Sequence, residues 1–186
     1  MLGFMACVAV FGCSKAGSQI TEPATAKPRT PVNPEKALYD QVSSGAYQIS
    51  AAIDSIEAVR KTAREIASRE KGNTQKALFA ISASLDDAGK ALADYGDDPP
   101  PFEEFKKNFA AQDDRRLKAI SAANQSLSDL GDAQDTLSDL LDSHPPEPES
   151  TELNNADSAL DDCVQAVEGA VKAMGGRVPA ADEAKN

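Results

Sequence analysis

Apolar and small side chains recur along residues 38–66 in alternating steps of four and three, and this spacing constrains the fold more than any other feature. The stripe comprises Leu38, Val42, Gly45, Ile49, Ala52, Ile56, Val59, Ala63 and Ile66. Such spacing places these side chains on one face of an α-helix. Asn33 and Pro34 suit the cap and first helical position, and Gly72 suits the C-terminal end. The sequence therefore predicts one long amphipathic helix over residues 34–71.

Three further segments show helical spacing. A helix over 74–95 is stopped by Gly96 and Pro99–Pro101, and one over 101–143 loses its apolar pattern at 112–116, where we expect a kink or register shift. Ser150 is the expected cap of a last helix that ends at Gly175-Gly176. The three stripes are Leu78, Ile81, Leu85, Ala88, Leu92 and Tyr95; then Leu117, Ile120, Leu127, Leu130 and Leu137; then Leu153, Ala156, Leu160, Cys163, Val167, Ala170 and Met174.

These segments predict an all-α domain over residues 33–176. Amphipathic helices with short connections favour an antiparallel bundle, and no run alternates with the period of a strand. Because the four helices are unequal in length, we expect an elongated bundle with fewer helices side by side at one end. Residues 13–32, rich in Gly, Ser, Thr and Pro, predict a disordered, flexible tether, and residues 177–186 predict a frayed tail.

The first thirteen residues form a short apolar run that ends in Val10-Phe11-Gly12-Cys13. This run resembles a bacterial lipoprotein signal, in which a cysteine follows a small residue and becomes the mature N-terminus. The resemblance implies that residues 1–12 are a signal peptide, that Cys13 is acylated, and that the protein is exported and lipid-anchored in the cell envelope. Ser14 after the cysteine implies the outer membrane, facing the periplasm, rather than the inner membrane.

Charge is distributed unevenly along the chain. The net charge is −11, and twelve Asp or Glu residues but no Lys or Arg lie between Lys118 and Lys172. Such a segment repels the phosphates of nucleic acids, so nucleic-acid binding is excluded.

The acidic residues of this segment recur at helical spacing and form the candidate partner-binding site. They are Asp129, Asp132, Asp135, Asp139 and Asp142 on one predicted helix, and Asp157, Asp161 and Asp162 on the next. We expect each set to share one helical face. A basic protein partner or self-association with the chain's own basic residues would suit such a surface; a divalent-cation site and a merely solvated face are the alternatives. The basic residues, in turn, could simply pair within the bundle.

Catalytic chemistry has little support in the sequence. His144 is the sole histidine, at a predicted helix end, and Cys163 lies on an apolar stripe. Phe102, Phe105 and Phe109 could line a pocket for an apolar ligand or cover an open end of the core. We therefore expect an interaction or structural module with no catalytic residue, metal or cofactor, and a small-ligand or divalent-cation binding protein as the alternative.

Overall fold

The computed structural model describes residues 33–143 and 145–179, which fold into five α-helices without a strand among them. The helices are α1 (Pro34–Arg69), α2 (Gly72–Leu92), α3 (Phe102–Lys107), α4 (Phe109–Asp142) and α5 (Glu149–Ala173). The predicted all-α class is confirmed. The predicted signal peptide, Cys13, the tether, His144 and residues 180–186 of the predicted tail lie outside the described residues.

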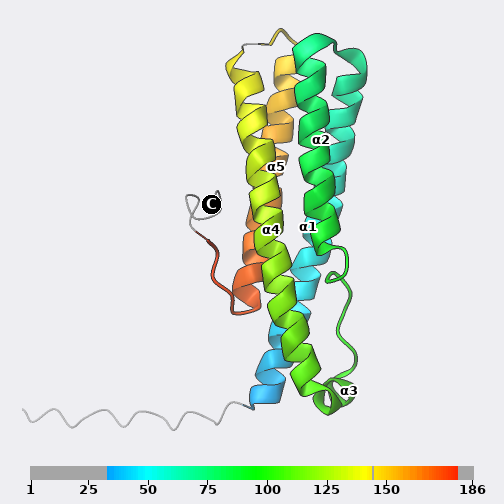
Figure 1. Ribbon diagram of the computed structural model, residues 1–186, viewed down its shortest axis with the longest axis vertical. Coiled ribbons are helices and arrows are strands. Elements are labelled where there is room, and N and C mark those ends of the chain that lie inside the picture. The colour runs from blue at the N-terminus through cyan, green and yellow to red at the C-terminus, as the bar shows by residue number, and fades with distance from the viewer. Residues whose placement is uncertain (1–32, 144, 180–186) are drawn as a thin grey trace, which may run out of the picture. The chain divides into compact units, whose positions relative to one another are not determined.

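The four long helices form an antiparallel bundle. Each packs against two neighbours, in the cyclic order α1, α2, α4 and α5, with α5 back against α1. The chain reverses direction between successive long helices, and α2 and α5 stop short of the end at which α1 and α4 begin (Figure 1). The short helix α3 lies at that end and contacts α1 and α4.

The core is built from the predicted apolar stripes. All nine stripe positions of α1 and all seven of the stripe that ends at Met174 are buried. The stripe predicted over α4 is wrong in part, because Leu117 is 54% exposed. The face that α4 buries is instead made largely of small side chains, among them Ala119, Ala123, Ser126 and Ala133.

The start of α1 follows the predicted capping chemistry. The Asn33 side chain accepts hydrogen bonds from the backbone N–H groups of Glu35 (2.9 Å) and Lys36 (3.3 Å), and Pro34 is the first helical residue. The predicted end is wrong by two residues, because α1 ends at Arg69 with Glu70 as its cap, and Gly72, with φ of +70°, begins α2 instead.

The predicted kink at 112–116 is wrong in position, because the helix is interrupted at Asn108, between α3 and α4. Aromatic packing accounts for the break. Tyr39 of α1 makes edge-to-face contacts with Phe102 and Phe105 at centroid distances of 5.3 and 5.2 Å, and Phe105 is fully buried. The turn at Asn108 thus lets α3 fold onto α1 and cover the core beyond the end of α2.

Of the two predicted ends of α5, the N-terminal one is wrong and the C-terminal one is confirmed. Ser150 does not cap the helix, which begins at Glu149 after Pro148 without a side-chain capping bond. Gly175 and Gly176 do end it: their N–H groups donate to the carbonyls of Lys172 (3.0 Å) and Val171 (2.8 Å), and Gly175 has φ of +77°. No helix in the described ranges has the length and apolar content needed to cross a membrane.

Candidate acidic interaction surface

The outer face of α4 carries four of the predicted carboxylates. Asp132, Asp135, Asp139 and Asp142 are exposed and lie opposite the buried stripe that contains Leu130 and Leu137. Their spacing of three or four residues makes them neighbours on this face, as predicted.

Asp129 is the exception on α4, since it is half-buried at the edge toward α2. Partial burial raises the pKa of its carboxyl, and the negative charges of Asp87 on α2 and of Asp132 add to the rise. A hydrogen bond from the side-chain amide of Gln125 (3.2 Å) acts in the opposite direction. Asp129 therefore belongs to the α2–α4 boundary rather than to the outer face.

On α5, only two of the three predicted aspartates continue this surface. The Gln134 side chain of α4 donates a hydrogen bond to Asp161 across the helix pair (2.7 Å), and Asp157 lies one turn before Asp161. Asp162 instead lines a groove with Ser55 and Thr62 of α1, so the expectation that it shares their face is wrong. We use the name acidic surface for Asp132, Asp135, Asp139, Asp142, Asp157 and Asp161.

Among the described residues, four of the six carboxylates of the acidic surface have no neutralising partner. In the part of the chain that the structure describes, the carboxylates of Asp139, Asp142 and Asp157 make no ion pair or hydrogen bond, and neither does that of Asp132. The last turn of α4 contains no basic residue. Because the C-terminal end of a helix carries partial negative charge, Asp139 and Asp142 are electrostatically unfavourable there.

Several basic side chains are paired with carboxylates elsewhere in the bundle. Arg60 joins Glu57 and Asp86 between α1 and α2 (2.5 and 2.6 Å), and hydrogen bonding to Glu57 leads the causes that raise its pKa. Arg69 of α1 makes two hydrogen bonds to Glu152 of α5 (3.1 and 2.7 Å).

Arg116 and Lys118 of α4 are paired as well. Arg116 donates to Asp113 and to the Met174 carbonyl (2.6 Å), and Lys118 pairs with Asp114 (2.7 Å). Pairing within the bundle therefore accounts for these four basic residues, while self-association stays a prediction.

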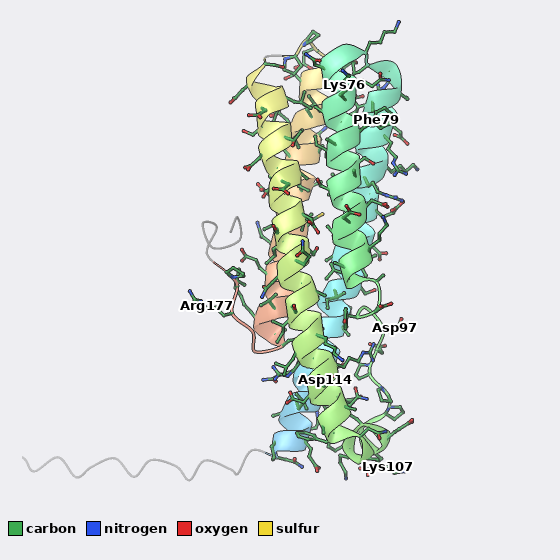
Figure 2. The ribbon with its side chains drawn as sticks, viewed as in Figure 1. Lys76, Phe79, Asp97, Lys107, Asp114 and Arg177 are labelled. Carbon is green, nitrogen blue, oxygen red and sulfur yellow. The ribbon has the colours of Figure 1, made fainter. Side chains whose placement is uncertain are left out.

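A groove opens beside the acidic surface, between α4, α5 and the segment that follows α5. It encloses about 260 Å³, and Arg177 marks the segment that forms its third wall (Figure 2). Its lining residues are Leu127, Ser128, Gly131, Asp132, Gln134, Asp135, Val164, Glu168, Val178 and Pro179. The sequence pattern did not predict this groove, although Gly131 in the middle of α4 was an available signal, since glycine weakens a helix interior.

The two alternative sites find no geometric support. No group of three His, Cys, Asp or Glu side chains within residues 33–143 and 145–179 is arranged to hold a metal ion. Phe105, which is fully buried, and Phe109 pack with Leu38, Val42 and Tyr39 as a second core cluster, and Phe102 contacts the Tyr39 ring. They cover the core rather than line a ligand pocket.

Cys163 is a core residue on α5. It is fully buried, and burial, with a smaller effect of Asp162, raises the pKa of its thiol to about 11. A thiol with so high a pKa is poorly nucleophilic at neutral pH.

No protein-family model, curated protein or solved structure matches this chain. The candidate function therefore depends on the chemistry of the acidic surface.

Proposed function

We propose that the protein is a lipid-anchored helical bundle of the cell envelope that works as an interaction or structural module, and that its acidic surface binds a basic partner. The anchor is inferred from Val10-Phe11-Gly12-Cys13, which resembles a lipoprotein signal. In this proposal Cys13 carries the lipid, and the bundle faces the periplasm from the outer membrane.

The observation that supports a binding role is that basic and acidic side chains differ in how they are paired. Arg60 and Arg69 are paired with carboxylates of neighbouring helices, whereas Asp132, Asp139 and Asp142 crowd one helix without a counter-charge among the described residues. Like charges at this spacing destabilise a helix, and the α4 dipole adds to the cost. A basic partner would supply the missing counter-charge, and water excluded from the contact would strengthen the attraction.

The test neutralises the outer face of α4. A variant with Asp132, Asp135, Asp139 and Asp142 changed to Asn, and the wild-type protein, are used as bait on solubilised envelope proteins at low and at physiological salt. We expect the wild type to retain a discrete set of basic proteins that the variant loses. We also expect salt to weaken that retention, because exposed charges are screened.

A matched control separates a local surface from net charge. It removes the same number of negative charges from exposed positions away from the acidic surface: Asp54, Asp97, Asp98 and Glu104, changed to Asn or Gln. The control should retain the partners. Equal retention by the wild type and the neutralised variant would contradict the proposal, and equal loss in both variants would reduce it to a net-charge effect.

A further inference from the structure

The groove beside the acidic surface joins an apolar floor to a charged rim. Leu127 of α4, Val164 of α5 and Val178 of the following segment are partly buried and contribute the floor. Asp132 stands exposed on the rim, and Glu168 lines the opposite side, where it pairs with Lys172 (2.7 Å). The Asp132 carboxylate, which has no counter-ion within residues 33–143 and 145–179, thus lies within reach of an apolar recess.

Gly131 keeps the recess open. A methyl group built at this position meets no atom of the described residues within 4 Å, so a side chain there would occupy the groove without displacing the core. The other glycines inside helices meet neighbours: at Gly45 the added carbon would lie 2.3 Å from Met174, and at Gly169 it would lie 2.5 Å from Gln48.

The volume and the lining of the groove restrict what kind of group can bind in it. At about 260 Å³ the groove is smaller than the pockets of about 300–1,000 Å³ that hold drug-sized ligands, and it is open to solvent. One long side chain suits it better. An arginine places its aliphatic stem on apolar surface while its guanidinium stays at the rim, and its planar fork binds a carboxylate through two hydrogen bonds.

We infer that this groove is the anchor point for an arginine side chain of the basic partner, with the stem against Leu127, Val164 and Val178 and the guanidinium on Asp132. This inference rests on the proposed function and specifies the site at which the partner binds. Arginines seated in such recesses are frequent sources of binding energy in protein interfaces. The neighbouring Asp139 and Asp142 then raise the rate at which the basic partner associates, without contacting the arginine directly.

The experiment titrates the isotopically labelled full chain with a capped pentapeptide that has one arginine among glycines, followed by amide NMR shifts. The comparison peptide has citrulline, the neutral isostere of arginine. We expect the arginine peptide to shift the amides of Leu127, Gly131 and Val164, and the citrulline peptide to bind at least about tenfold more weakly, since a charge-assisted hydrogen bond is lost.

Two glycine variants decide whether the groove itself binds. Gly131→Leu fills the groove and leaves every charge in place, so we expect at least about tenfold weaker binding of the arginine peptide. Gly89→Leu is the matched control, because Gly89 lines a comparable groove of about 220 Å³ between α1 and α2, where Asp86 is already paired with Arg60. Both variants are first checked for unchanged helical circular dichroism, and the control should bind like the wild type.

The outcomes separate this inference from the proposed function. Unchanged binding by Gly131→Leu, equal binding of the citrulline peptide, or shifts confined to Asp139 and Asp142 would overturn the groove as the anchor. None of these results alters the capture of envelope proteins by the acidic surface. Loss of capture on neutralising that surface, with Gly131→Leu still capturing the same proteins, would leave the proposed function standing and remove this inference.

Discussion

Two glycines inside long helices offer a direct test of the packing, because the same substitution should have opposite effects at them. Gly45 of α1 and Gly131 of α4 are both in helix interiors, where glycine is about 0.5–1 kcal/mol less favourable than alanine. They differ in what a new methyl group would meet. At Gly131 no atom of the residues that the structure describes lies within 4 Å, whereas at Gly45 the Met174 Cγ lies 2.3 Å away and the Sδ 2.9 Å away.

The magnitudes follow from those neighbours. Gly131→Ala should keep the full gain and stabilise the protein by about 0.5–1 kcal/mol. Met174 is only 2% exposed, so Gly45→Ala forces it against a filled core; such overpacking costs about 1–3 kcal/mol and outweighs the propensity gain. For a domain of this size, 1 kcal/mol corresponds to about 2–4 °C in Tm.

The assay is urea and thermal unfolding of both variants beside the wild type, followed by circular dichroism of the helices. Gly131→Ala should raise the midpoint and Gly45→Ala should lower it, with similar dependence on urea concentration in all three. Equal stabilisation by both substitutions would refute the close approach of α1 to Met174. A loss of stability at Gly131 would refute the open groove on α4.

Three further predictions concern burial. Asp129→Asn should raise Tm at neutral pH, because the folded protein raises the pKa of that carboxyl and so disfavours its charged form. The gain in Tm should fade as the pH falls through the pKa of Asp129, since the wild-type carboxyl then protonates. A gain in Tm that is independent of pH would contradict this cause. Cys163, with its thiol pKa raised to about 11, should react with a thiol reagent only as fast as the protein unfolds. The labelling rate is measured in a chain whose other two cysteines are replaced. Rapid labelling of the folded protein would contradict the burial of Cys163. Leu85→Ala should cost about 2–5 kcal/mol in the free energy of unfolding by urea, since Leu85 is fully buried, and a cost below about 1 kcal/mol would place α2 outside the core.

Every stripe position predicted for α1 and α5 is buried, because large aliphatic residues recur on those faces among the small ones. On α1 and α5, residues such as Ile49, Ile56 and Leu160 recur among polar neighbours, so periodicity alone identified the core. On α4 the buried face includes Ala119, Ala123 and Ser126, which a hydrophobic pattern barely registers. Leu117 was therefore placed in the core, although it faces solvent.

The break at Asn108 and the limits of the acidic surface depend on contacts between helices. Local propensity permits a helix through Asn108, and only the packing of Phe105 against α1 shows why the chain turns there. Spacing placed the aspartates of α4 on one face, but it could not tell that Asp129 lies beside α2 or that Asp162 lies beside α1. The groove could not be predicted from helical spacing for the same reason, since its third wall comes from residues after α5.

We propose that this bundle is held in the cell envelope by a lipid on Cys13, and intact mass tests this proposal most directly. The full chain and a Cys13→Ala variant are expressed in a bacterial host, separated into membrane and soluble fractions, and weighed by mass spectrometry. The account predicts a membrane-bound chain that begins at Cys13 and carries two or three acyl groups, with the modification and the membrane association both lost in the variant. An unmodified, full-length product in the soluble fraction for both chains would contradict it.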